Sequence, residues 1–481
     1  MREIVKWLPA LAMTLGTAVS AFAASAPKVV FHLDFNVAQL KATTVSNMLE
    51  RVAADGYNAI LWEIEDKVRW ESAPFAEGAF TKAEFRALLA KAKSLGLEPI
   101  PLMQTFGHAE YVLRHPQYAA LREDPEKWGC YCVSKPETRR FLKTLLHEYL
   151  ELFGEDVKWF HLGGDEAHGF GKCGVCSKRH PMELYGEHLA AVSEELRARG
   201  IRPSIWCDMV FGDKYAAGAD RVPRDFTIWN WDYEVPAHPM CKWTKRLDQM
   251  KKLGFKTVFA VATASWGDGP FLPDMRYHRL NADYGAAYAR TNALDGFCVT
   301  SWAVRQNPKR LQLPLIDFAA KRFLSPAADA ADDWQAALDS NGVKMSAEAL
   351  DELSGWMPLW SCYDSRSKVP LPPSPGAWWK IKPELGTRDL ADFLAGEKRI
   401  ERALAEASGE WKLAGELQLK MLRTARLAVE GKDWPAPPVE ETRRFLGVEQ
   451  TPSSAETSAD LIWGYWEKSS DLKGRSLLKR H

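Results

Sequence analysis

Two features that would point to particular classes of protein are missing from this 481-residue sequence. Neither sign of charge is in excess: 63 Lys and Arg residues balance 63 Asp and Glu residues, and the isoelectric point is about 7.2. A neutral chain offers no general attraction to a polyanion, so no nucleic-acid partner is expected. Beyond the N-terminus, no apolar run is long enough to cross a bilayer, so no membrane span is expected.

The first 26 residues are typical of a cleaved secretory signal. Two basic residues precede an apolar stretch over 7–19, and small residues surround positions 21–23. The apolar stretch is too short for a comfortable membrane span, and the cleavage region has no cysteine that could carry a lipid. We therefore expect 1–26 to be a signal peptide and the protein to be exported, either to the periplasm or outside the cell.

A barrel is the fold that the distribution of apolar residues predicts. Eight β-branched or aromatic runs read as strands, over 29–34, 59–65, 98–105, 159–166, 202–209, 227–233, 257–266 and 296–302. Amphipathic segments such as 81–97 and 137–154 lie between most of them, and the helix predicted between the fifth and sixth is the least certain. Eight strand–helix units predict an α/β protein with a (β/α)8 TIM barrel over 27–325. A doubly wound sheet would alternate similarly, but no Gly-rich nucleotide loop follows the first strand.

The pattern changes after about residue 325. A Pro-rich, Trp-containing connector over 371–383 precedes a long helical segment over 387–429. We expect a mainly helical C-terminal domain over 326–481, packed on the barrel and ending in a polar tail after about Thr451.

Two adjacent carboxylates follow the fourth predicted strand, in the stretch WFHLGGDEAH over 159–168. Catalytic groups of such barrels lie at the C-terminal ends of strands. On a regular strand, Asp165 and Glu166 would point to opposite faces, but the two preceding glycines let the backbone turn both side chains into one pocket. A pair in which one acid protonates a leaving oxygen and its neighbour orients the substrate is typical of some glycoside hydrolases. A solvated surface pair is the alternative.

The motif and its surroundings resemble a known family. Residues 161–166, His-Leu-Gly-Gly-Asp-Glu, match the His-x-Gly-Gly-Asp-Glu signature of glycoside hydrolase family 20, the β-N-acetylhexosaminidases. The segments PLMQTFGHAEYVLRHPQYAALRE (101–123), ILWEIED (60–66) and WCDM (206–209) resemble most closely the hexosaminidase D-like branch. The resemblance covers the barrel but does not obviously extend to the helical C-terminus.

The resemblance implies an exo-acting, retaining β-N-acetylhexosaminidase that releases terminal β-linked GlcNAc or GalNAc from glycans and requires no cofactor. In substrate-assisted catalysis, the acetamido oxygen of the sugar attacks the anomeric carbon, and water opens the resulting oxazolinium ion. Glu166 would act as the acid and then the base, while Asp165 would orient the acetamido N–H. This requires Glu166 to be protonated near neutral pH while Asp165 stays ionised, as repulsion and burial would favour.

Aromatic and polar residues at other strand ends are the implied sugar contacts. The predicted substrate-binding residues are Asp34, Glu65, His108, Trp206, Asp208, Trp231, Tyr233, Trp266 and Trp302. For each tryptophan, packing inside the barrel is the alternative, and either Trp229 or Tyr233 is expected to be core. His108 could contact the sugar or the acid pair. The arginine clamp of the better-known branch is replaced by HLDFN, with Arg305 a weak substitute, so the choice between GlcNAc and GalNAc stays open.

Four of the eight cysteines form two close pairs, Cys130 with Cys132 and Cys173 with Cys176. In an exported protein we favour two cross-loop disulfides, but the spacing also fits a four-thiolate structural zinc site. Cys207 and Cys298 lie in apolar segments and are expected to be buried, inert thiols.

Two other functions are alternatives for the same barrel. A metal-dependent hydrolase would draw on His32, His108, His161 and His168, but it usually needs a His-x-His on the first strand, and this chain has His32-x-Asp34. A non-catalytic glycan-binding barrel would have no need of a proton donor such as Glu166.

Overall fold

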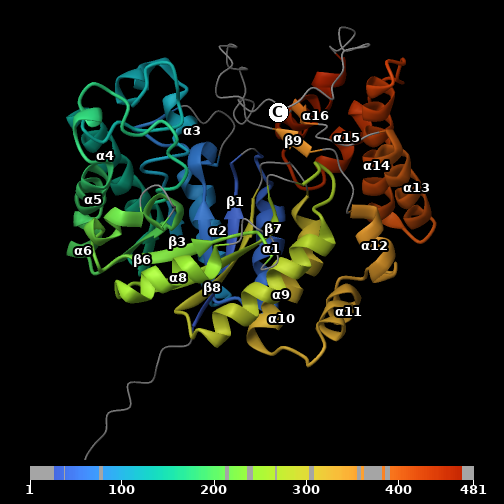
Figure 1. Ribbon diagram of the computed structural model, residues 1–481, viewed down its shortest axis with the longest axis horizontal. Helices are drawn as coiled ribbons and strands as arrows, with labels where there is room; N and C mark the ends of the chain where they lie inside the picture. Colours follow the sequence, from blue (N-terminus) through green and yellow to red (C-terminus); the bar gives the residue numbers. More distant parts are fainter. Residues whose placement is uncertain are drawn as a thin grey trace, which may run out of the picture.

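The computed structural model describes residues 27–36, 38–74, 80–211, 216–235, 242–265, 268–302, 308–354, 359–361, 382–384 and 390–467. A barrel of strands surrounded by helices forms one part of the molecule, and a group of helices coloured orange to red stands on one side of it (Figure 1). The expected signal peptide and most of the Pro-rich connector lie outside the described residues.

Eight parallel strands close into a barrel in sequence order, which confirms the predicted fold. They are β1 (Lys28–Asp34), β2 (Ala59–Glu63), β3 (Glu98–Leu102), β4 (Trp159–His161), β5 (Arg202–Trp206), β6 (Thr227–Trp231), β7 (Lys256–Ala264) and β8 (Gly296–Ser301). Most end a few residues before the predicted limit. The largest difference is in β4, because Gly163 and Gly164 after it take φ of 64° and 89° and leave strand geometry.

Side chains alternate along the strands and so form two buried layers. Val30, Leu61 and Ile100 belong to a cluster inside the barrel, whereas the adjacent Phe31 and Ile60 belong to the core between strands and helices. The inward side chains fill the barrel, so its interior is a packed core that supports the strand ends from below.

Helices and short turns connect the strands. They are α1 (Ala42–Ala54), α2 (Lys82–Ser94), α3 (Glu110–Leu113), α4 (Pro136–Phe153), α5 (Pro181–Val192), α6 (Glu194–Ala198), α7 (Asp208–Phe211), α8 (Trp243–Lys252), α9 (Met275–Thr291) and α10 (Leu313–Leu324). Thr81 and Glu84 form a reciprocal capping box at the start of α2, and α4 ends at Gly154 with φ of 77°, as its sequence predicts. Between β5 and β6 the described chain holds only short helical turns.

The C-terminal region is mainly helical, as expected. It contains α11 (Ala330–Ser340), α12 (Ala347–Ser354), α13 (Leu390–Leu404), α14 (Gly409–Val429), α15 (Val439–Leu446) and α16 (Pro452–Glu467), with a strand pair, β9 (Leu359–Ser361) and β10 (Lys382–Glu384). The single long segment predicted over 387–429 is two helices, because the chain turns over 405–408 and α13 packs on α14. The Glu449 carboxylate accepts the backbone N–H groups of Lys309 and Arg310, which ties this region to the barrel.

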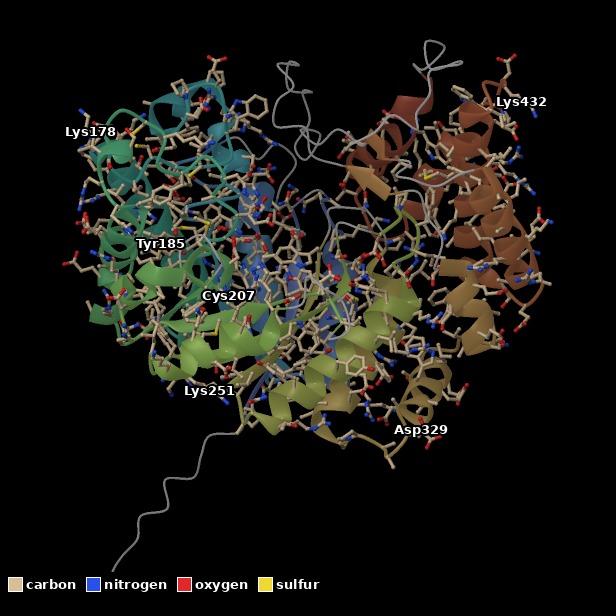
Figure 2. All side chains as sticks on the ribbon, in the orientation of Figure 1. Lys178, Tyr185, Cys207, Lys251, Asp329 and Lys432 are labelled. Atoms are coloured by element: carbon tan, nitrogen blue, oxygen red, sulfur yellow. The ribbon has the colours of Figure 1, made fainter. Side chains whose placement is uncertain are left out.

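Burial separates two kinds of side chain in Figure 2. Lys251 and Asp329 are exposed at the periphery, whereas Tyr185 and Cys207 are fully buried. Cys207 and Cys298 are buried thiols, as predicted, and burial raises the pKa of Cys207 to about 12. Among the described residues, no helix has both the length and the apolar character that a membrane span needs.

Candidate active site

Strained backbone marks the rim of the barrel after three consecutive strands. Four described non-glycine residues have positive φ, and three of them are Glu65 (38°), His108 (48°) and Glu166 (43°), which follow β2, β3 and β4. Left-handed backbone costs a non-glycine residue about 1–3 kcal/mol and persists only where its surroundings impose it. The clustering at one end of the barrel indicates a site that holds these side chains in place.

Close packing explains why glycines precede the acid pair. A β-carbon at Gly163 would lie 1.9 Å from Gln104 Oε1, and one at Gly164 would lie 2.5 Å from the Tyr185 hydroxyl. Together with their positive φ, this leaves no room for a side chain at either position. The bend they allow brings Asp165 and Glu166 to the same imidazole.

That imidazole is His108. Its Nε2 lies 3.4 Å from Asp165 Oδ2 and 3.3 Å from Glu166 Oε2. Of the two contacts proposed for His108 from sequence, the structure therefore contains the one with the acid pair. Asp165 is buried, while the side chain of Glu166 is 43% exposed. The buried Asp165 therefore lies beside an acid, Glu166, that a ligand can reach.

The charges of this trio differ from the sequence-based prediction. Burial lowers the pKa of His108, but the two carboxylates outweigh it and hold the pKa well above 6.5. Burial raises the pKa of Glu166, but the hydrogen bond and positive charge of His108 outweigh it and leave that pKa below 4.5. The sequence predicts a protonated Glu166, whereas the shifts in pKa favour a protonated His108 beside an ionised Glu166. The prediction considered the two acids alone and missed the cation that the fold inserts between them.

Asp165 has an unused oxygen. Its Oδ1 is buried and has no hydrogen-bond partner among the described residues. Leaving a buried acceptor unpaired costs about 1–3 kcal/mol, and more when the group is charged. The oxygen is therefore available to a donor that arrives with a ligand.

Asp208 connects the acid to the aromatic residues of the site. Its Oδ2 accepts the backbone N–H of Glu166 at 2.9 Å, and its Oδ1 accepts the indole N–H of Trp231 at 3.1 Å. Burial and the nearby Asp165 raise the pKa of Asp208 to about 7. Both of its oxygens hold protein groups, so the structure supports a positioning role, and a direct sugar contact stays a prediction.

Three partly exposed aromatics stand at the ends of β6 and β8. The rings of Trp231 and Tyr233 are 5.4 Å apart at 31°, and the Tyr233 hydroxyl accepts the indole N–H of Trp302 at 2.7 Å. Trp206 was predicted to line the pocket, but its side chain is 0% exposed. Trp229 is also 0% exposed, so both tryptophans pack in the barrel interior. This identifies Trp229, not Tyr233, as the core residue.

Trp266 and Arg305, predicted from sequence as a sugar contact and a weak clamp, lie outside the described residues.

A second group of polar side chains lies beside the trio, toward β1 and β2. Glu63 accepts a hydrogen bond from Gln104 Nε2 at 2.8 Å and contacts His32 Nε2 at 2.9 Å. Burial lowers the pKa of His32 to about 4, so this ring is neutral, and burial raises the pKa of Glu63 to about 7. Asp34 and Glu65 are buried next to this pair, and their role as sugar ligands stays a prediction.

Sequence reasoning did not select Glu63, Gln104 or Lys309 as site residues. The first two were visible as polar residues at strand ends. Lys309 had no such signal, because it follows β8 in a helical turn and reaches back to Ser301 through its ammonium group. That ammonium is buried near Asp34, and burial lowers its pKa to about 8.

The histidines do not assemble a metal centre within the described chain. His161 Nδ1 accepts the N–H of Gly163, and its ring packs 4.4 Å from that of Trp206. Where the described residues are concerned, ligand atoms converge only around Cys132, Cys173, Cys176 and Glu123.

The cysteines are arranged differently from both sequence-based alternatives. None of the six described cysteines forms a disulfide, contrary to the favoured alternative. Cys130 does not join the other three either: its thiol donates to the Tyr131 carbonyl at 3.4 Å, and Glu123 stands where a fourth cysteine was expected. On an extended chain, residues two apart such as Cys130 and Cys132 would point to the same side. The fold of the loop turns their side chains apart.

Comparison with known proteins agrees with this geometry. Residues 60–265 match the family model described as the catalytic domain of glycosyl hydrolase family 20. The chain is 28% identical over 296 residues to human hexosaminidase D, covering 56% of this chain and 59% of that protein. It is also 28% identical over 293 residues to bovine hexosaminidase D, covering 83% of that relative. The chain thus spans just over half the length of the human protein.

A solved structure gives the same fold. The β-N-acetylhexosaminidase from Bacteroides fragilis NCTC 9343 superposes with a TM-score of 0.54 at 17% identity, over 66% of this chain and 70% of that chain. At this identity, the likeness concerns the fold alone. Residues 60–265 of this chain, which include the acid pair after β4, are therefore similar to the catalytic domain of glycosyl hydrolase family 20.

Proposed function

We propose that this protein is an exo-acting, retaining β-N-acetylhexosaminidase that removes terminal β-linked GlcNAc or GalNAc from glycans by substrate-assisted catalysis. The observation that carries the proposal is the unpaired, buried Asp165 Oδ1 next to the half-exposed Glu166. A buried carboxylate oxygen without a donor fits an acetamido N–H, whose hydrogen bond would aim the acetamido oxygen at the anomeric carbon. The same carboxylate would stabilise the positive charge that develops on the acetamido group.

The acid step needs a proton at Glu166. His108 Nε2 lies 3.3 Å from Glu166 Oε2, close enough to pass a proton to that carboxylate. A neutral sugar that covers the site removes water from Glu166, which raises the cost of its charge and moves the proton toward it. Glu166 then donates to the glycosidic oxygen, and afterwards takes a proton from the water that opens the oxazolinium ring.

The aromatic residues supply the sugar-binding surface. Trp231, Tyr233 and Trp302 form one connected set, with Trp231 fixed to Asp208 and Trp302 fixed to Tyr233. Indole and phenol rings pack on the apolar faces of a sugar and on its acetamido methyl group. This supports a pocket for a single N-acetylated residue at the reacting position.

The first experiment measures hydrolysis of the p-nitrophenyl β-glycosides of GlcNAc and GalNAc, with the β-glucoside as the matched substrate that lacks the acetamido group. We expect activity on one or both N-acetylated substrates and none on the glucoside. Asp165→Asn should lower kcat and weaken inhibition by a thiazoline that mimics the oxazolinium ion, since the amide presents the wrong charge. Equal rates on the glucoside would contradict substrate assistance.

Two further measurements address stereochemistry and exo action. The anomer that forms first, followed by proton NMR, should be β if the configuration is retained. Chito-oligosaccharides should lose single residues from the non-reducing end, whereas internal cleavage would contradict exo action. Export remains part of the proposal, and the N-terminal sequence of the protein from its native compartment should begin near residue 27 if 1–26 is removed.

A further inference from the structure

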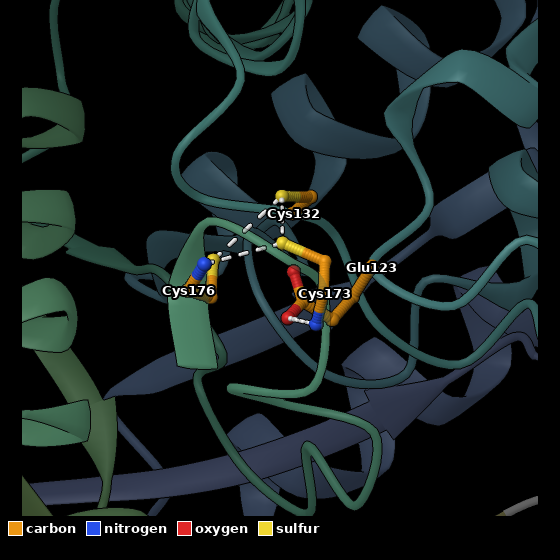
Figure 3. Close-up of side chains that lie close together, drawn as sticks. All are labelled: Glu123, Cys132, Cys173 and Cys176. Atoms are coloured by element: carbon orange, nitrogen blue, oxygen red, sulfur yellow. Dashed lines mark hydrogen bonds between the residues drawn. The ribbon is translucent and has the colours of Figure 1, made fainter. Parts of the chain in front are cut away.

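We propose that Cys132, Cys173, Cys176 and Glu123 bind one structural zinc ion that fastens together the two loops carrying His108 and the acid pair. The proposal is independent of the reaction at Glu166, and its tests do not use activity. A carboxylate oxygen of Glu123 and the three sulfur atoms all lie within 4.8 Å of one another. In Figure 3 the sulfur atoms form a triangle with the carboxylate beside it.

The sulfur separations fit a metal ion better than a disulfide. Cys132 Sγ lies 3.7 Å from Cys173 Sγ and 3.8 Å from Cys176 Sγ. Zinc–sulfur bonds of about 2.3 Å at the tetrahedral angle place two sulfurs about 3.8 Å apart. A disulfide requires about 2.05 Å. In addition, one cysteine equally close to two others can pair with only one of them, whereas a metal uses all three.

The surroundings of the sulfurs favour thiolates. The backbone N–H of Cys176 donates to Cys173 Sγ at 3.3 Å, and the Ser134 hydroxyl lies 3.0 Å from Cys176 Sγ. Donors of this kind orient metal-bound thiolates and reduce their charge.

Glu123 is built into the loop as a fixed ligand. Its Oε1 accepts the N–H groups of Lys172 and Cys173 at 2.8 and 2.9 Å. Its Oε2 is buried, with no N–H or O–H donor among the described residues, and the side chain is 2% exposed. A cation bound there would compensate the buried carboxylate.

The position of the cluster gives the ion a structural task. Cys132 follows Tyr131, whose N–H donates to the Phe106 carbonyl at 3.0 Å, two residues before His108. Cys173 follows Glu166 in the next loop, and the rings of Phe106 and Phe170 meet at 4.6 Å. The ion would therefore join the segment after β3 to the segment after β4, close to where both bend into the site.

The test is metal analysis of the purified full-length chain. We expect about one zinc per chain after desalting, and at least a tenfold lower content in Cys132→Ser and Cys176→Ser. Cys298→Ser, which changes an isolated buried thiol, should keep the metal. Cys130→Ser should keep it as well, which separates this ligand set from the four-cysteine alternative.

Because a ligand variant can fail to fold, two measurements use the unaltered chain. Cobalt taken up in place of zinc should show thiolate-to-cobalt charge transfer and the absorption of a tetrahedral ion. Removal of the metal by a chelator should lower Tm by about 5–10 °C, and zinc should restore it. An intact mass reduced by the hydrogens lost in a disulfide, with no bound metal, would overturn the proposal. Loss of zinc in Cys130→Ser would overturn the assigned ligands.

Discussion

The backbone N–H of Glu166 donates a hydrogen bond to Asp208 Oδ2 across 2.9 Å. The other oxygen of the same carboxylate accepts the indole N–H of Trp231. The first side chain of α7, directly after β5, therefore sets the position of the acid relative to the aromatic residues. This relationship explains how Glu166, with φ of 43°, keeps a strained conformation.

Asp208→Asn should lower kcat by about 10²-fold, because an amide has a single acceptor oxygen and cannot serve both N–H donors. Steady-state kinetics and Tm should be measured together. The exposed Asp220→Asn is the control and should change neither. Unchanged kcat in Asp208→Asn would mean that Glu166 is held by other contacts.

Glu166→Gln should reduce kcat/KM by about 10²–10⁴-fold on substrates with a poor leaving group. The reduction should be smaller on the p-nitrophenyl glycoside, whose leaving group departs with little protonation. Comparing the two ratios distinguishes loss of an acid from general damage to the site. The exposed Glu155→Gln is the matched control, and an equal reduction on both substrates would argue against the acid role.

The pH dependence should follow the proton shared by His108 and Glu166. Since the carboxylates hold the pKa of His108 well above 6.5, the proton is kept until the pH rises through that value, and activity falls on the basic side. In His108→Asn, Glu166 must hold the proton alone. The pKa of Glu166 then loses the lowering effect of His108, while burial still raises it.

The basic limb of the kcat/KM profile should therefore move to lower pH in His108→Asn. His147→Asn, at a largely exposed histidine away from the site, should leave the profile in place. A basic limb that does not move in His108→Asn would show that His108 does not share the catalytic proton.

Gly163→Ala should destabilise the protein and reduce its activity. The new β-carbon would lie 1.9 Å from Gln104 Oε1 and would displace the amide that donates to Glu63. Gly200→Ala is the matched control, because Gly200 also has positive φ, 70°, but has nothing within 4 Å of the added carbon. The control should cost only the conformational strain of about 1–2 kcal/mol.

The free energy of unfolding and kcat should be measured for both alanine variants. We expect Gly163→Ala to lose about 1–3 kcal/mol more than Gly200→Ala and most of its activity. Equal losses would mean that the contact with Gln104 relaxes without cost.

The order of strands and helices could be predicted from sequence, because apolar periodicity and end signals such as Thr81 and Gly154 act over a few residues. The acid pair could be predicted too, since Gly163 and Gly164 announce a bend in front of two carboxylates. The predicted strands extend beyond the observed ones because the periodic pattern continues into residues whose backbone has already left the sheet. The turn over 405–408 was missed for the same reason, since helical composition continues across it.

Contacts between residues far apart in the sequence could not be predicted, because they form only when the strands pack together. His108 contacts both Asp165 and Glu166 and lowers the pKa of Glu166. Trp206 is buried inside the barrel, and Glu123 takes the place expected for Cys130. The barrel and the side chains at its rim could be predicted, because they follow from local patterns of polarity along the chain. The charge and exposure of a site residue depend on neighbours that other strands supply, so they are set only when the barrel closes.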